Sequence, residues 1–292
     1  MNPATERYLD LARLGRNEWW RYALGVFIIA FSWLVLGYLP YLILVVAAGV
    51  EADPLPVFVA VNFSIFMMLA GLAVTVKIVH RRSLLSLVAP DAGVDWRRIG
   101  RGALVWAALA VVSAVIEHVL FPERYYLSYD PERFFGFVAA VLVLTPIQCA
   151  TEELVFRGYV TQGLGLLTRR PAVIAVASSI AFTVPHLLNP EVAQHGALLM
   201  AANYFAIGML LATVTLRDGR LELAIGLHAV NNVFLGLVAN YEGSALMTEA
   251  VFTAQELDPV YSLVTLIAGA ILFHWWVFAW TRRPAAGMGA AG

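Results

Sequence analysis

The stretch FFGFVAAVLVLTPIQCATEELVFRG, residues 134–158, is apolar over most of its length and ends among three charged side chains. Glu152, Glu153 and Arg157 therefore lie at the end of a segment long enough to cross a bilayer, which takes about 20 residues. A charge near the bilayer centre costs about 2.5–3.5 kcal/mol on insertion scales. A chain that keeps several such charges is expected to use them, so this stretch predicts a membrane protein with a polar site in its interior.

The composition agrees with a membrane protein. Hydrophobic residues make up 61% of the chain and charged residues 13%, and the mean hydropathy is +0.76. Soluble proteins average about 45–50% and about 25%. The net charge of −1 gives no basic surface for nucleic acid, so lipids are the expected surroundings. The single cysteine, Cys149, excludes an internal disulfide and a cysteine-rich metal cluster.

Apolar runs of spanning length predict an all-α fold, a polytopic membrane helical bundle of about eight transmembrane helices. No linker divides them, so we expect one membrane-embedded domain over residues 23–283. Residues 1–22 are interpreted as a cytoplasmic amphipathic lead-in and residues 284–292 as a disordered tail. The runs lie at about 23–50, 55–80, 102–121, 134–157, 171–188, 196–216, 221–240 and 259–281.

The cations give an independent test of this count. Arginines and lysines gather before the first run and after the second, fourth, sixth and eighth, whereas the other loops are acidic or neutral. Cytoplasmic loops carry an excess of Lys and Arg. The alternation therefore predicts a multi-pass protein with both termini in the cytoplasm, and we expect the membrane to be a bacterial inner membrane.

The polar residues of the quoted stretch divide by their spacing. Glu153 and Arg157 are four apart, so they share a helix face and can form an ion pair. Glu152 points about 100° away and gains no such partner. A buried carboxylate without a cation suits a general base. We therefore expect Glu153 to be structural and Glu152 chemical; the alternative is a solvated segment at the cytoplasmic interface.

Two later segments add polar groups. Pro185 precedes His186 and is expected to distort the helix there, although a lone histidine at a helix end is more often interfacial than catalytic. His228 and Asn232 are four apart on an otherwise apolar run. That pair can stabilise an oxyanion or can join helices by hydrogen bonds.

Together these motifs are more specific than any one of them. Glu-Glu-x-x-x-Arg, Phe-x-x-x-His and His-x-x-x-Asn, in that order on successive membrane segments, resemble the CPBP family. These are the CAAX-protease and bacteriocin-processing intramembrane endopeptidases, also called Abi proteins, and they include the type II CAAX prenyl endopeptidases. The match covers about residues 151–234, and every motif position is filled.

The resemblance implies a hydrolase that cuts a peptide or lipid-modified protein substrate in the membrane. It implies that Glu152 and His186 activate a water, that His228 and Asn232 hold the carbonyl oxygen, and that Glu153 and Arg157 support them. A zinc ion is the alternative, with Glu152, His186 and His228 as ligands, since one carboxylate and two histidines form a familiar zinc set. No His-Glu-x-x-His helix is present, so we expect no obligatory metal.

Two rival classes remain. In a transporter, the same residues would relay protons, but two related halves, which many transporters show, are not visible. A decayed, non-enzymatic protease core is expected to have lost a motif residue, and none is lost. The sequence does not identify the substrate: prenylated CAAX proteins, bacteriocin-like peptides and lipid-anchored proteins all remain candidates.

One difficulty concerns depth. At about 1.5 Å per residue, His186 lies about 24 Å from Arg170, but His228 lies only about 12 Å from Arg220. The two can share a site if the fifth run is tilted or broken, or if residues 158–170 fold back along the interface. His80 is expected in a solvated loop, Cys149 can line the cavity, and Asn203 and Tyr204 can contact the site.

Overall fold

A computed structural model describes residues 1–47, 49, 53–91, 93–245 and 248–279 of the chain. The proposed tail, residues 284–292, lies outside the described residues. Helices dominate, and the predicted all-α membrane bundle is confirmed. The membrane helices are α2–η3 (Trp19–Val46), α4–η4 (Pro54–Val79), α5 (Trp96–Leu120), α6–α7 (Pro131–Leu167), α8 (Pro171–His186), α10 (Ala197–Asp218), α11 (Glu222–Leu237) and α12–η8 (Pro259–Ala279).

The long helices contain short π-helical turns. The first is divided into α2 (Trp19–Phe31), η2 (Ser32–Leu36), α3 (Tyr38–Tyr41) and η3 (Leu42–Val46). The others are divided into α4 (Pro54–Val74) and η4 (Thr75–Val79); α6 (Pro131–Glu153), η7 (Leu154–Val160) and α7 (Thr161–Leu167); and α12 (Pro259–His274) and η8 (Trp275–Ala279). Short elements connect them: α1 (Pro3–Asp10), η1 (Leu11–Leu14), η5 (Leu84–Leu87), η6 (Pro122–Arg124) and α9 (Pro190–His195).

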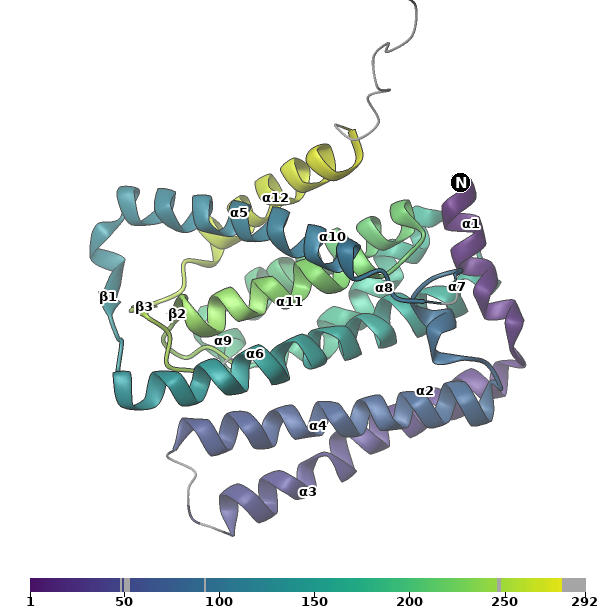
Figure 1. Ribbon diagram of the computed structural model, residues 1–292, viewed down its shortest axis with the longest axis horizontal. Coiled ribbons are helices and arrows are strands. Elements are labelled where there is room, and N and C mark those ends of the chain that lie inside the picture. Colours follow the sequence, from purple (N-terminus) through teal and green to yellow (C-terminus); the bar gives the residue numbers. More distant parts are fainter. Residues whose placement is uncertain (48, 50–52, 92, 246–247, 280–292) are drawn as a thin grey trace, which may run out of the picture.

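Within the described residues, six of the helices are long and apolar enough to cross a membrane. The remaining two, α8 and α11, are apolar but have only 16 residues each. The expected number of apolar runs is thus present. Figure 1 shows them as a bundle in which α11 lies alongside α5 and α6.

Local sequence explains where the long helices begin. Aspartates precede α4, α5, α6 and α12, and each carboxylate accepts a backbone N–H of the first turn, which an N-cap residue does. Proline follows the aspartate in three of these, at the position where its missing N–H costs nothing. The capping residues are Asp53, Asp95, Asp130 and Asp258.

Small residues bring the site-bearing helices into close contact. A Cβ added at Gly102 of α5 would lie 2.3 Å from the carbonyl oxygen of Leu223, and one at Gly226 of α11 would lie 2.0 Å from that of Ile99. Only glycine allows the two backbones to approach so closely, which is how membrane helices pack tightly. This contact fixes α11, and with it His228, against α5.

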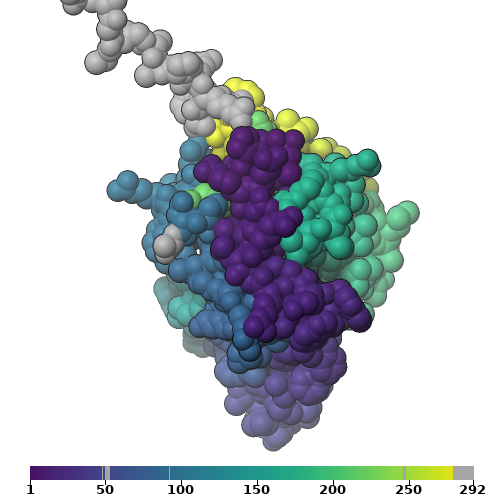
Figure 2. Space-filling model, turned by 90° about the vertical axis from the view of Figure 1, so that its right-hand side faces the viewer, coloured from purple at the N-terminus to yellow at the C-terminus, as the bar shows by residue number. Residues whose placement is uncertain are grey.

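One end of the bundle is closed by the N-terminal segment. The amphipathic helix α1 lies across this end (Figure 2), and its Tyr8 and Leu9 are fully buried, as is Ala12 of the following η1. The hydroxyl of Tyr8 lies 2.8 Å from the carbonyl oxygen of Leu87 and 2.9 Å from that of Arg157. We call this the α1 end; its amphipathic segment packs into the protein rather than lying apart from it.

The α1 end also buries His80, which the sequence placed in a solvated loop. That prediction is wrong, because the side chain has 0% exposure. Its Nδ1 lies 2.7 Å from the carbonyl oxygen of Arg16 and its Nε2 lies 3.0 Å from the hydroxyl of Tyr159. Burial lowers the pKa of His80.

Three short strands stand at the opposite end, which we call the sheet end. β1 (Tyr125–Leu127) pairs antiparallel with β3 (Phe252–Ala254), and β3 pairs parallel with β2 (Ala239–Tyr241). The strands tie together the loop between α5 and α6 and the loop between α11 and α12. The strands lie at this end of the bundle (Figure 1), and residues of both loops line a cavity there.

The depth difficulty is resolved by the fourth membrane helix. It does not fold back after Gly158 but continues as one helix to Leu167. A Cβ at Gly158 would lie 3.6 Å from Leu221, so α11 begins at the level of Gly158 and not at the end of α7. Glu152 lies about two helical turns from Gly158, and His228 lies about two turns from the start of α11. The two side chains therefore lie at a similar depth.

Candidate active site

A cavity of about 530 Å³ extends from the middle of the bundle to the sheet end. All four residues expected to carry the chemistry, Glu152, His186, His228 and Asn232, line it. The lining comes from η2, from the helices α4 to α6 with η7, from α8 to α12, and from the strands and loops at the sheet end. The structure therefore brings together residues that lie up to 80 positions apart in the sequence.

Glu153 and Arg157 form the ion pair that their spacing predicts. Arg157 Nη1 donates to Glu153 Oε1 at 3.0 Å, and both side chains have 0% exposure. Arg157 Nη2 donates to the carbonyl oxygen of Gly208 at 3.2 Å, and the guanidinium lies 4.1 Å from the ring centroid of Phe182. Pairing, a carbonyl and an aromatic face together offset the cost of burying this cation.

His228 adds a contact that the sequence did not reveal. Its Nδ1 lies 2.8 Å from the same oxygen of Glu153, and its Nε2 lies 3.9 Å from Glu152 Oε2. A carboxylate only accepts, so Nδ1 carries the proton in this contact. Glu153 thus orients the imidazole as well as binding Arg157, and it directs Nε2 toward Glu152.

Glu152 is buried, with 7% exposure, and has no arginine or lysine partner among the described residues. Gln148 Nε2 donates to its Oε1 at 3.2 Å. The 3.9 Å between its Oε2 and His228 Nε2 is too long for a hydrogen bond, but one water can contact two polar atoms at this separation. The adjacent glutamates thus have the different surroundings that the helix geometry predicted.

The break in helix geometry falls beside these residues. The π-helical turn η7 begins at Leu154, directly after the two glutamates. Such turns are frequent at functional sites because they change the direction of side chains within a continuous helix. Here the turn begins directly after Glu153 and contains Arg157, the last charged residue of the motif.

His186 is held by its own helix and by two aromatic rings. Its Nδ1 lies 2.7 Å from the carbonyl oxygen of Phe182, and its ring centroid lies 4.3 Å from that of Phe182 and 4.8 Å from that of Tyr204. A carbonyl oxygen only accepts, so Nδ1 donates and Nε2 has a free lone pair. α8 ends at this histidine, one residue after Pro185, so the ring stands at the end of a helix and at the cavity wall.

Asn232 is oriented by its neighbours. Trp106 Nε1 donates to Asn231 Oδ1 at 2.9 Å, and Asn231 Nδ2 donates to Asn232 Oδ1 at 3.1 Å. Because its oxygen is occupied, Asn232 can offer its amide nitrogen to a group in the cavity. These two hydrogen bonds, from Trp106 on α5 to Asn232 on α11, also connect the two helices that are in close contact.

A metal centre is the alternative use of these residues. No group of three or more His, Cys, Asp or Glu in the part of the chain that the structure describes could hold a metal ion. Each histidine does have one ring nitrogen fixed by an acceptor, as metal ligands have, but Glu152, His186 and His228 do not converge as a zinc set would. No step is therefore assigned to a metal.

Several residues bear on the remaining predictions for the site. Cys149 is fully buried and is not among the residues that line the cavity, although its side chain contacts that of His228. Asn203 and Tyr204 do line it, as expected. Sequence reasoning missed Gln148, whose spacing of four from Glu152 was an available signal. It also missed Asn231, which adjoins Asn232, and Glu191, which the sequence showed only as an acidic loop residue.

Similarity to known proteins agrees with this geometry. The family model described as "Type II CAAX prenyl endopeptidase Rce1-like" matches residues 132–234, the segment that holds the three motifs. The resemblance is confirmed. The chain is also 28% identical over 274 residues to the uncharacterized protein YyaK of Bacillus subtilis (strain 168), covering 89% of this chain and 91% of that protein. No solved structure gives a significant match.

The Rce1-like match supports, at a coarse level, a CAAX-type intramembrane protease, which is a hydrolase. Together with the apolar helices it supports an integral, multi-pass membrane protein. These matches do not assign a role to any single residue.

Proposed function

We propose that this protein is an intramembrane endopeptidase that hydrolyses a peptide bond of a membrane-associated or lipid-modified substrate. The observation that carries the proposal is the cluster of Glu152, Glu153 and His228 at the wall of a buried cavity, with Arg157 behind it. The family match over residues 132–234 supports the same reaction class. No obligatory metal or cofactor is part of the proposal.

In this mechanism Glu152 accepts a proton from a water that lies between its carboxylate and His228. The water oxygen forms a bond to the carbonyl carbon, and the carbonyl π electrons move onto its oxygen. When the C–N bond breaks, Glu152 returns the proton to the leaving amine. A positioned carboxylate in this role contributes about 10²–10⁴-fold, and His186 helps to orient the water through its free Nε2.

The oxyanion needs donors in a site that excludes water. His228 Nε2 and Asn232 Nδ2 are the two groups that line the cavity and are oriented by other contacts. For His228 to donate from Nε2 it must be an imidazolium, and the Glu153 carboxylate at Nδ1 balances that charge. The proposal thus gives Glu153 a second role beyond pairing with Arg157.

Cleavage by purified protein tests this proposal directly. Wild-type protein in detergent is incubated with a library of apolar and lipid-modified peptides, and the products are identified by mass spectrometry. We expect new termini at defined bonds, absent from a Glu152→Gln sample prepared in parallel. Intact peptides in both samples, from folded protein, would reject the endopeptidase proposal.

We further propose that both termini lie in the cytoplasm, in a bacterial inner membrane, and that the sheet end faces the opposite side. The arginine-rich loops lie at the α1 end, and cytoplasmic loops carry such an excess. On a Cys149→Ser background, we expect an impermeant thiol reagent to label Glu123→Cys in intact cells. Arg97→Cys is expected to react only after lysis; the reverse pattern would overturn this orientation.

A further inference from the structure

The cavity wall carries negative charge at the sheet end. Its lining includes five carboxylates and, among the described residues, no lysine or arginine: Glu117, Glu152, Glu191, Glu256 and Asp258. Two of these are neutralised from outside the lining, because Arg124 lies 2.8 Å from Asp258 and 3.4 Å from Glu117. Glu191 and Glu256 have no such partner among the described residues.

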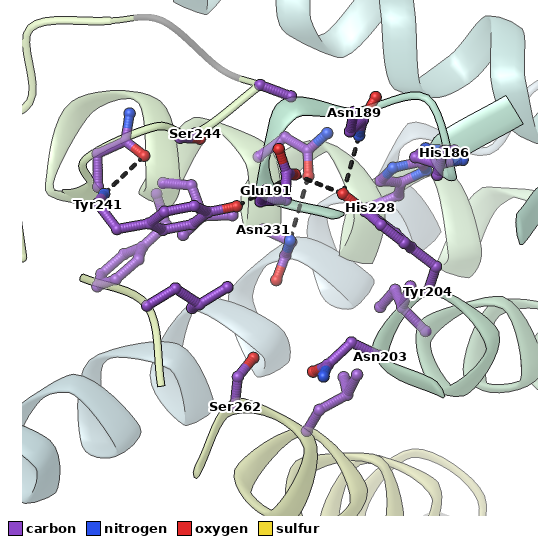
Figure 3. Close-up of a pocket in the computed structure, with 18 of the residues that line it drawn as sticks. His186, Asn189, Glu191, Asn203, Tyr204, His228, Asn231, Tyr241, Ser244 and Ser262 are labelled. Atoms are coloured by element: carbon purple, nitrogen blue, oxygen red, sulfur yellow. Dashed lines mark hydrogen bonds between the residues drawn. The ribbon is translucent and has the colours of Figure 1, made fainter. Parts of the chain in front are cut away.

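Glu191, on α9, is unusual among these because it is buried. Its side chain has 3% exposure, and the groups that donate to it are neutral. The hydroxyls of Tyr204 and Tyr241 both donate to Oε1 (Figure 3), the second at 3.3 Å. Burial and the nearby carboxylate raise the pKa of Tyr241, which keeps its hydroxyl a donor.

The second oxygen of this carboxylate has no donor. Glu191 Oε2 is buried and lacks a hydrogen-bond partner in the described structure. A buried carboxylate without a cation costs several kcal/mol, and leaving one of its oxygens unpaired adds about 1–3 kcal/mol. This is an arrangement that a cationic ligand would stabilise.

Asn203, on α10, also lines the cavity and also has an acceptor atom without a donor. Its Nδ2 donates to the carbonyl oxygens of Leu199 at 3.1 Å and of Pro259 at 2.9 Å, which fixes the amide. Its Oδ1 is buried and lacks a donor in the described structure. Glu191 and Asn203 thus both line the cavity, and each has one buried acceptor atom without a donor among the described residues. Figure 3 shows Asn203 and Tyr204 on neighbouring parts of the cavity wall.

We propose that Glu191, assisted by Asn203, forms a subsite that binds a lysine or arginine side chain of the substrate. The inference rests on the proposed endopeptidase function and specifies its substrate class. Tyr204 joins the subsite to the reaction centre, because its hydroxyl bonds Glu191 while its ring lies 4.8 Å from that of His186. An extended peptide advances about 3.3–3.6 Å per residue, so the cation lies within a few residues of the cut bond.

The same charges act against other substrates. A free C-terminal carboxylate or an acidic side chain near the cut bond would meet the buried carboxylate of Glu191, where solvent screens the repulsion poorly. The structure therefore favours an internal bond in a segment that carries a basic residue. A tripeptide leaving group with its own terminal carboxylate is disfavoured.

Binding to an inactive protein tests the subsite separately from cleavage. The probes are fluorescent leucine- and alanine-rich peptides with amidated C-termini, in which a single lysine is moved one position at a time. Each has a glutamine and a glutamate counterpart. Their affinities for the Glu152→Gln protein are measured by fluorescence anisotropy in detergent.

At one or a few positions we expect lysine to bind roughly tenfold more tightly than glutamine, and glutamate more weakly than both. Adding Glu191→Gln removes the difference between lysine and glutamine, while the fold is kept because glutamine still offers an oxygen to both tyrosines. Glu256→Gln is the matched control, since it removes one charge from the same cavity at an exposed position, and the lysine preference remains.

Equal affinities for lysine and glutamine peptides at every position would overturn the subsite, even if the Glu191→Gln protein failed to fold. A preference that survives Glu191→Gln, or that Glu256→Gln removes equally, would also overturn it. Cleavage by the wild-type protein is scored separately. If it cuts none of the peptides but shows the Glu191-dependent preference, the endopeptidase proposal fails and the subsite stands. Cutting without that preference rejects the subsite and leaves the endopeptidase proposal in place.

Discussion

The two ends of the bundle solve the same packing problem in opposite ways. At the α1 end, the N-terminal segment of the chain fills the space between the helices: Tyr8 and Leu9 of α1 are fully buried there. At the sheet end, the helices surround a cavity of about 530 Å³, and short strands connect the loops beside it. The filled end is expected to carry stability, and the hollow end is expected to accept another chain.

This difference separates the effects of mutations. Substitutions at the cavity wall should change the reaction rate and leave the free energy of unfolding nearly unchanged. Substitutions at the α1 end should do the reverse. Glu153 lies between the two regions, because it contacts His228 on the cavity side and Arg157 on the other, so it should change both.

Glu152→Gln is expected to have the largest effect on rate. Glutamine cannot accept the proton of the attacking water, so kcat should fall by about 10²–10⁴. The thermal midpoint in detergent should stay close to that of the wild type, since Gln148 can still bond the amide. If the variant lost both activity and stability, the expectation that cavity residues act on the rate and not on the free energy of unfolding would be wrong.

Glu153→Gln is expected to have the largest effect on stability. Arg157 has 0% exposure and would lose its carboxylate, and breaking a buried pair on one side costs about 3–5 kcal/mol. Activity should fall as well, because His228 loses the acceptor at Nδ1. Thermal unfolding in detergent and the cleavage rate measure the two effects.

The double variant Glu153→Gln/Arg157→Met provides the control. It removes the unpaired cation, so part of the stability should return, since buried pairs are often replaceable by apolar side chains. Activity should not return, because His228 still lacks its carboxylate. If activity recovered along with stability, Glu153 would have only a structural role.

Asn232→Ala is expected to slow the reaction by about 10²–10³ with little change in KM, as loss of an oxyanion donor does. Asn231→Ala is a useful companion and should have a smaller effect, because Asn231 links Trp106 to Asn232 by hydrogen bonds and has no assigned contact with the oxyanion. A raised KM with unchanged kcat would instead assign Asn232 to substrate binding or to helix packing.

Tyr8→Phe tests the α1 end. The variant removes a buried hydroxyl that lies near two carbonyl oxygens, and one hydrogen bond contributes about 1 kcal/mol. The thermal midpoint should fall slightly while kcat stays at the wild-type value. A large loss of activity in this variant would show that the filled end is coupled to the cavity.

The sequence predicted the membrane helices well because bilayer thickness and hydropathy set them one by one. It also predicted the pair of Glu153 and Arg157, because a spacing of four on one helix is a local rule. The roles assigned to Glu152, His186 and Asn232 stay predictions. The geometry supports them but measures no reaction.

Contacts between distant segments could not be predicted in the same way. The contact of His228 with Glu153 depends on how α11 packs against α6, and that packing depends on the level at which α11 begins. His80 was misplaced for the same reason: the loop pattern was correct, but its burial comes from the N-terminal segment and from Tyr159. Glu191 looked like one more acidic loop residue until α10 and β2 placed two tyrosines on it.

Chelation is expected to have the smallest effect, and it tests whether the cavity contains a metal centre or a glutamate base. Under the proposed mechanism, exhaustive treatment with a chelator leaves kcat unchanged, and elemental analysis finds far less than one zinc per chain. pH dependence cannot make this distinction, because acid would protonate Glu152 as a base and would also release zinc from histidines. A second, kinetically different chelator guards against a metal that exchanges slowly. If a chelator inactivated the protein and stoichiometric zinc restored activity, Glu152, His186 and His228 would be zinc ligands that converge only when the metal is bound. The cavity would then not be preformed, and its contrast with the filled α1 end would be wrong.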